Sequence, residues 1–225
     1  LLGFENYAEL SVAKKMAGSP EEILSFLREL GGKAKPQAAE EMKLVEIHAR
    51  TAHGLQKIEP WDQAYYSEKL KQDLFEISDE LLRPFFPVPR VLEGMFEVAR
   101  RLFEIDIKEN NTLATWHDDV ATFDIKRGGE LVASFYLDLY ARENKRSGAW
   151  MAECRAKRIR LKGDLQKPVA FLTCNFSGPI GTNAALLSHQ EVITLFHEFG
   201  HGLHHMLTKV EVASVSGING VCWDA

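Results

Sequence analysis

Apolar and charged residues follow one another with helical periodicity through most of the first hundred positions. Apolar positions three and four residues apart share one face of a helix, and this pattern predicts helices over residues 19–30, 36–55, 60–82 and 91–103. Ser19 and Glu22 form a capping box, and Gly31-Gly32 is expected to end that first helix. Prolines recur within residues 83–89, so we expect an extended connector there.

A period of two replaces the helical period after residue 120. Residues 122–126 and 131–140 alternate, and Arg127-Gly128-Gly129 between them predicts the turn of a β-hairpin. A further strand is expected over residues 167–176, and a second capping box opens a last helix over residues 188–207. The pattern predicts a mainly α fold, with a helical region over residues 1–110. Residues 111–225 then hold one small antiparallel-type sheet that precedes the last helix.

The composition is that of a globular protein from a reducing compartment. Of the 225 residues, 45% are hydrophobic and 26% are charged, unlike disordered, collagen or coiled-coil chains. A net charge of −5 argues against a nucleic-acid-binding protein, and no apolar run approaches the roughly 20 residues of a membrane helix. Cys154, Cys174 and Cys222 are too widely spaced for a disulfide framework. We expect no signal peptide, and both ends look cut from a longer protein.

The last helix contains the motif His197-Glu198-Phe199-Gly200-His201, which has the form H-E-x-x-H. Residues four apart lie one turn apart on the same face, so both imidazoles can reach one metal ion. Glu198 is rotated about 100° from His197, which places its carboxylate beside the metal, where it can take a proton from water. The sequence therefore predicts a zinc site with His197 and His201 as ligands and Glu198 as a catalytic base.

Zinc needs a third protein ligand, and the sequence offers no convincing one. His204 shares the metal-facing side by angle, but seven residues rise about 10.5 Å, which is too far for three ligands from one straight helix. We therefore expect His204 to support a ligand or to face solvent, and Glu211 to be a surface charge. Asp224 is expected either to hold a ligand imidazole or to cap a helix.

The last helix and its approach resemble a known peptidase family. Leu187-Ser188-His189-Gln190-Glu191-Val192 leads into His197-Glu198-Phe199-Gly200-His201-Gly202-Leu203-His204-His205, and this combination is similar to the thimet oligopeptidase family of zinc peptidases. Further blocks of the likeness lie at residues 2–7, 61–66, 136–142, 172–176 and 215–220. The likeness extends over nearly the whole chain, which corresponds to a minority of a family member.

The resemblance implies a zincin-like metallopeptidase core in a helical, elongated enzyme, whose deep channel admits short peptides and excludes folded proteins. It implies that His197 and His201 bind one Zn²⁺ per active site and that Glu198 is the general base. The family's third ligand is a Glu that follows a Trp-Asp-like pair, and this chain stops at Trp223-Asp224-Ala225.

These observations predict a zinc-dependent metallo-endopeptidase, an oligopeptidase that hydrolyses short unfolded peptides with zinc-activated water. Residues 169–173 are either an edge on which the substrate backbone pairs or a core strand. We expect a cytoplasmic, monomeric parent protein, with peptide substrates and neither nucleic-acid nor membrane partners. Two alternatives stay open: a non-catalytic peptide-binding homologue, and a truncated fragment that is inactive because the third zinc ligand is missing.

Two other polar clusters have structural interpretations. Trp116-His117-Asp118-Asp119 mixes metal-binding residue types, but its position before a strand favours a turn with a capping Asp. Basic side chains gather over residues 155–162. Because the chain carries a net negative charge, we expect a solvated helix face there and not a nucleic-acid site.

Overall fold

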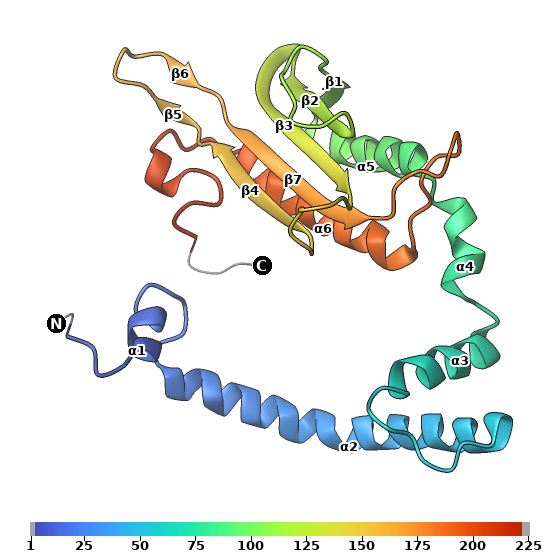
Figure 1. Ribbon diagram of the computed structural model, residues 1–225. Helices are drawn as coiled ribbons and strands as arrows, with labels where there is room; N and C mark the ends of the chain where they lie inside the picture. Colours follow the sequence, from blue (N-terminus) through green and yellow to red (C-terminus); the bar gives the residue numbers. More distant parts are fainter. Residues whose placement is uncertain (1–2, 222–225) are drawn as a thin grey trace. The chain divides into compact units, whose positions relative to one another are not determined.

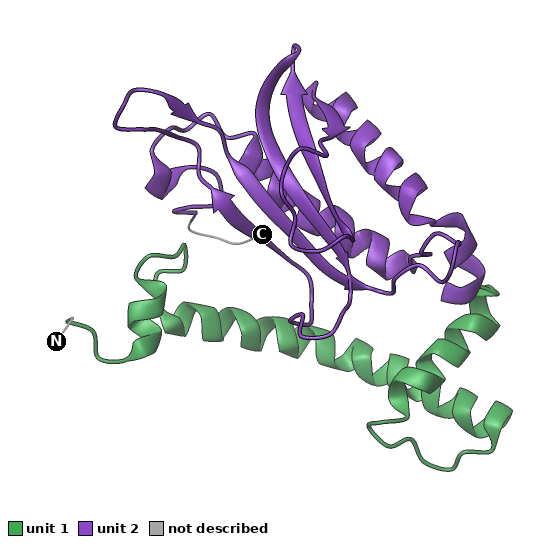
Figure 2. Cartoon of the chain, turned by 45° about the horizontal axis from the view of Figure 1, so that its top comes forward, with its two compact units in different colours: residues 1–78, 222–225 green, residues 79–221 purple. Residues whose placement is uncertain are grey.

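The computed structural model describes residues 3–221, and its contacts divide the chain into two units (Figure 2). Unit 1 holds the residues up to Ser78, and unit 2 holds Asp79–Val221. The predicted helical region, residues 1–110, includes helix α5 (Val88–Phe103), which belongs to unit 2. The physical reason is that α5 buries Val88, Val91, Met95 and Ala99 in the core of unit 2.

Unit 1 consists of α1 (Tyr7–Val12), α2 (Pro20–His53) and α3 (Gln63–Phe75). The Ser19 side chain caps α2 by accepting a hydrogen bond from the Glu22 amide, as the capping box predicts. The predicted end at Gly31-Gly32 is wrong, because α2 continues through both glycines and Pro36. Each glycine costs only about 1 kcal/mol in a helix, and strong helix formers flank the pair. The helix ends at Gly54, which has the left-handed φ of 69°.

The predicted helix over residues 60–82 is interrupted. Helix α3 ends at Glu76, whose φ is 55°, and a separate short helix α4 (Asp79–Leu82) belongs to unit 2. The connector expected to be extended contains a 3-10 turn, η1 (Arg83–Phe85), and α5 begins at Val88. The prolines permit this because they occupy the first helical positions, where an amide donor has no partner to lose.

A five-stranded sheet forms the centre of unit 2, in the order β1 (Asp106–Glu109), β2 (Val120–Arg127), β3 (Glu130–Tyr140), β7 (Val169–Phe176), β4 (Trp150–Arg155). The predicted hairpin is confirmed: β2 and β3 pair, and Gly128 and Gly129 have φ of 58° and 85°, as a type I′ turn requires. The expectation of an antiparallel-type sheet is confirmed for three of the four strand pairs and is wrong for β3 and β7, which run parallel. The chain leaves β3, forms β4 and a side hairpin, and returns beside β3.

That side hairpin consists of β5 (Arg158–Ile159) and β6 (Leu165–Gln166). It replaces the helix predicted for the basic residues 155–162, which is therefore a wrong prediction. Gly163, with φ of 85°, lies in the turn of this hairpin, and its amide donates a hydrogen bond to the Arg160 carbonyl. Across this turn, the Arg160 amide donates to the Asp164 carbonyl and the Arg160 guanidinium donates to the Asp164 carboxylate, and these bonds stabilise the hairpin.

Helices α5 and α6 (His189–Met206) cover the same face of the sheet (Figure 1). Phe96 of α5 contacts Phe123 and Phe135 on the sheet and Phe199 of α6, with ring centroids 5.1–6.2 Å apart. This cluster fixes α6 on the sheet. Helix η2 (Ala213–Val215) follows α6. Within residues 3–221, no helix is both long and apolar enough to cross a membrane.

Candidate metal centre on helix α6

The start of α6 is fixed by the capping box that the sequence predicts. The Ser188 hydroxyl accepts from the Glu191 amide at 3.1 Å, and the Ser188 amide donates to the Glu191 carboxylate at 2.7 Å. Both bonds satisfy amides that a helix start leaves unpaired. The phase of the helix, and hence the direction of every side chain that follows, is thereby set.

His197 and His201 lie side by side on the outward flank of α6. Their Nε2 atoms are 3.1 Å apart, and the ring planes are nearly perpendicular, at 88°. Two nitrogens bound to one tetrahedral zinc at 2.0–2.1 Å lie about 3.3 Å apart, so the observed spacing fits a shared zinc ion. His197 is exposed and His201 is half-buried.

Glu198, the residue after His197, is buried, with 8% of its surface exposed. Burial of the Cys174 thiol on β7 raises its pKa, and the negative charge of the Glu198 carboxylate raises it further, to about 12. Cys174 therefore stays protonated and acts as a small apolar core residue. The motif thus combines two neighbouring imidazoles with a buried carboxylate on the same turn of α6.

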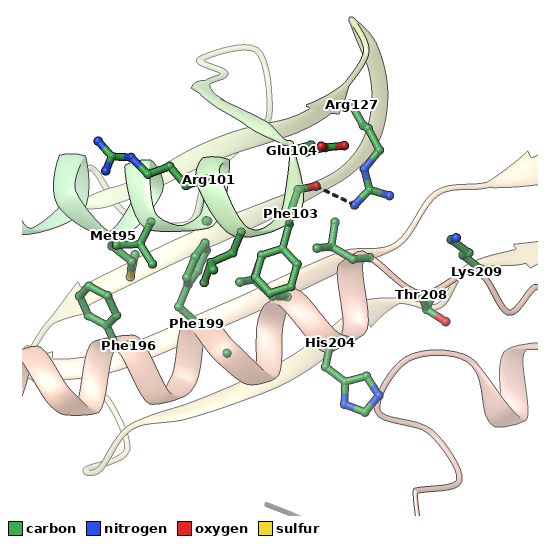
Figure 3. A pocket seen from close by; sticks show the side chains of 16 residues that line it. Met95, Arg101, Phe103, Glu104, Arg127, Phe196, Phe199, His204, Thr208 and Lys209 are labelled. Atoms are coloured by element: carbon green, nitrogen blue, oxygen red, sulfur yellow. Dashed lines mark hydrogen bonds between the residues drawn. The ribbon is translucent and has the colours of Figure 1, made fainter.

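A cavity of about 1000 Å³ lies on the other flank of α6, between this helix and α5. Figure 3 shows Phe103, Phe196 and Phe199 between the helices, with Arg127 donating to the Phe103 carbonyl at 3.1 Å. His204 lines this cavity and is exposed, but His197, Glu198 and His201 do not line it. This cavity is therefore separate from the candidate metal centre.

No third ligand joins the histidine pair in the described part of the chain. Residues 3–221 contain no group of three or more His, Cys, Asp or Glu side chains that could hold a metal ion. Glu211 is exposed and lies 3.7 Å from Lys157 as an ion pair. Asp224, for which the sequence left two roles open, lies outside the described residues.

The segment 116–119 forms the predicted turn, but the side chain that accepts a backbone hydrogen bond in it is His117 and not the expected Asp. The Asp119 amide donates to Nδ1 of His117, and the Val120 amide donates to the His117 carbonyl, which opens β2. Of the two roles proposed for residues 169–173, the core strand is correct, because β7 lies between β3 and β4. The strand at that edge of the sheet is β4, which the sequence did not reveal.

Sequence reasoning also missed two buried polar groups, His205 and Asp138, which are 0% and 3% exposed. For His205, the helical period offers a signal, since it follows His201 by one turn. For Asp138, the signal is a carboxylate followed by Arg142 and Lys145, yet their convergence depends on the loop after β3.

Comparison with known proteins decides the family. Residues 1–225 match the model of peptidase family M3. The chain belongs to peptidase family M3. The family resemblance carried by the motif blocks is thereby confirmed. Within the family, the same blocks are similar to those of bacterial oligopeptidase A, and relatives of that kind bear this out.

Individual M3 relatives agree. Oligopeptidase A of Escherichia coli strain K12 is 54% identical over 226 residues, which are 100% of this chain and 33% of that protein. Organellar oligopeptidase A of Arabidopsis thaliana is 40% identical, over 100% of this chain and 29% of its own length. Dipeptidyl carboxypeptidase of E. coli K12 is 36% identical, over 97% of this chain and 32% of its own length. The chain thus spans about a third of the length of these M3 peptidases.

Proposed function

We propose that the protein containing this chain is a zinc-dependent metallo-endopeptidase, an oligopeptidase that hydrolyses short unfolded peptides. The observation that carries the proposal is the pair of Nε2 atoms of His197 and His201, 3.1 Å apart, beside the buried Glu198. Membership of peptidase family M3 supports peptide hydrolysis as the reaction. The names of the oligopeptidase A relatives support short peptides as substrates.

In this proposal His197 and His201 hold zinc through Nε2, and a third ligand comes from outside residues 3–221. The family resemblance implies that this ligand is a Glu. When bound, zinc supplies Lewis-acid chemistry, which polarises a peptide carbonyl and lowers the pKa of water towards about 7.

Glu198 is the general base of the proposed reaction. It accepts a proton from the attacking water and returns it to the leaving amine nitrogen, so that the carboxylate is regenerated in each turnover. Glu198 is 8% exposed, so burial restrains its side chain from turning out into solvent.

Strand β4 is the substrate-binding edge in this proposal. It is the outermost strand at its edge of the sheet, beside β7 and next to α6 (Figure 1). An extended peptide can add to such an edge through backbone hydrogen bonds, which require no particular side chain. This mode of binding suits short unfolded peptides of varied sequence.

The cellular setting in this proposal is the cytoplasm. Cys154 and Cys174, the cysteines among the described residues, are both free thiols. Free thiols suit a compartment that keeps cysteines reduced.

The replacement Glu198→Gln in the whole protein tests the proposal. Because only the proton acceptor is lost, kcat for a short internally quenched peptide should fall by about 10³-fold, while zinc content and KM change little. Glu211→Gln is the matched control and should cleave at the parent rate. A Glu198→Gln variant that cleaves as fast as the parent contradicts the proposal. A parent protein that binds peptides without cleaving them supports the peptide-binding alternative instead.

A further inference from the structure

His205 is a fully buried polar side chain at the end of α6 that the proposed reaction does not use. Its Nε2 lies 3.0 Å from the carbonyl oxygen of Arg155, the last residue of β4. A carbonyl oxygen only accepts hydrogen bonds, so the ring carries its proton on Nε2 and donates it. One side chain of α6 is therefore bonded directly to the backbone of the edge strand.

The other nitrogen of the ring is enclosed. Within the described residues, Nδ1 of His205 is buried and has no hydrogen-bond partner, and the nearest acidic oxygen, Oε2 of Glu153, is 3.9 Å away. Gly217, with φ of 63°, lies against the ring, and a Cβ there would be only 2.5 Å from Nδ1. The segment after α6 thus closes over His205, and Asn219 joins it to β4 by donating to the Glu153 carboxylate.

This arrangement is costly for a residue that only fills space. A leucine would occupy a similar volume without burying an unpaired nitrogen, which is unfavourable for stability. Unlike leucine, histidine can donate a hydrogen bond to the Arg155 carbonyl oxygen. That bond reaches β4 just after an irregularity at Cys154, where the pairing with β7 shifts register between Glu153 and Arg155. At this irregularity, the backbone hydrogen bonds between β4 and β7 hold the end of β4 less firmly than they would hold a regular strand.

The position of His205 on the helix connects it with the candidate metal centre. Four residues correspond to one full turn of an α-helix plus about 40°, and to an advance of about 6 Å along its axis. His205 therefore lies one turn after His201 and points in a similar direction. The flank that bears the histidine pair is therefore the flank that faces β4. The cavity between α5 and α6 lies on the other flank of α6.

We propose that His205 is a positioning residue, which holds the edge strand β4 at a fixed place beside the metal-bearing flank of α6. The inference rests on the proposed peptidase function, in which a substrate backbone pairs with β4. A peptide aligned on a displaced β4 meets the histidine pair in the wrong register. Loss of the His205–Arg155 bond thus weakens substrate binding more than it slows the chemical step.

Two replacements of His205 and one control test the inference in the whole protein. His205→Leu removes the donor at similar volume, His205→Gln keeps a side-chain N–H, and His204→Leu changes the exposed neighbour. With His205→Leu we expect KM for short peptides to rise about tenfold with kcat within about twofold, and zinc content unchanged. His205→Gln should recover most of the lost affinity, and His204→Leu should behave as the parent.

Hydrogen exchange of the β4 amides, residues 151–155, provides a readout that does not depend on activity. His205→Leu should speed exchange in β4 by at least about tenfold while leaving β2 and β3 protected, because only the edge strand is released. Unchanged exchange in β4 overturns the inference. Equal damage from His205→Gln and His205→Leu also overturns it, since the donor then does not matter. If the parent cleaves no peptide, the proposed function fails, and exchange still decides whether His205 holds β4.

Discussion

At the scale of single residues, Asp138 is a buried carboxylate held by cations. Arg142 donates to both of its oxygens at 2.6 and 2.7 Å, Lys145 donates at 2.8 Å, and the indole of Trp116 donates at 3.2 Å. Burial by itself raises the pKa of Asp138, but these bonds outweigh it and hold the pKa at about 2. The network fastens the loop after β3 to the sheet.

We therefore expect Asp138→Asn to lower the free energy of unfolding at pH 7 by about 3 kcal/mol, because it leaves buried cations without their counter-charge. The folded pKa lies below the unfolded value of about 3.9, so this stabilisation is complete above about pH 4 and is lost as the pH falls towards about 2. Urea unfolding from pH 7 to pH 2 measures it, with the exposed Glu130→Gln as control. A stability gap between parent and Asp138→Asn that stays constant below pH 4 contradicts this account.

At the scale of elements, the contact between α6 and β7 depends on a glycine. A Cβ at Gly202 would lie 3.0 Å from Cδ2 of Leu172, whereas a Cβ at Gly200 would meet no atom within 4 Å. Both glycines stand inside the same helix. Gly202 therefore allows the helix to approach the strand closely, and Gly200 faces open space.

Replacing each glycine by alanine separates helix propensity from packing. Gly200→Ala should raise the free energy of unfolding by about 0.5–1 kcal/mol, the ordinary gain for alanine in a helix. Gly202→Ala gains the same propensity but crowds Leu172, so we expect it to be less stable than Gly200→Ala by about 1 kcal/mol. Chemical denaturation of both variants measures the difference. Equal stabilisation by both would show that α6 does not press on Leu172.

The same helix shows how far sequence patterns reach. Its start at Ser188, its apolar side and the outward placement of His197 and His201 are all local consequences of a 3.6-residue period, and they were predictable. The course of β4 was not, because its exposed residues 153–155 lie at an edge and lack a clear alternation. The burial of His205 and Asp138 depends on the folding-back of loops 208–221 and 141–149, which no local pattern encodes.

At the scale of the whole molecule, the hydrophobic core belongs to unit 2. Its buried cluster runs from Val88 to Met206, whereas α3 in unit 1 buries no residue and α2 buries only Val45 and Ala49. Large apolar side chains such as Phe26, Leu27 and Leu30 of α2 are more than half exposed. The stability of the chain therefore resides in residues 79–221.

We expect the isolated fragment 79–221 to unfold in one cooperative transition, and the fragment 3–78 to lose structure gradually, because its helices bury too little apolar surface. Circular dichroism during urea titration of both fragments measures this. A cooperative transition in fragment 3–78, or none in fragment 79–221, contradicts the assignment of stability to unit 2.

The central claim is that His197 and His201 hold a catalytic zinc ion. The most direct measurement is the zinc content of the dialysed whole protein by atomic emission, compared among the parent, His201→Gln and His204→Gln. We expect about one zinc per chain in the parent and in His204→Gln, and at most about a tenth of that zinc content in dialysed His201→Gln. Full zinc retention in His201→Gln would contradict the claim, because the metal would then be held elsewhere.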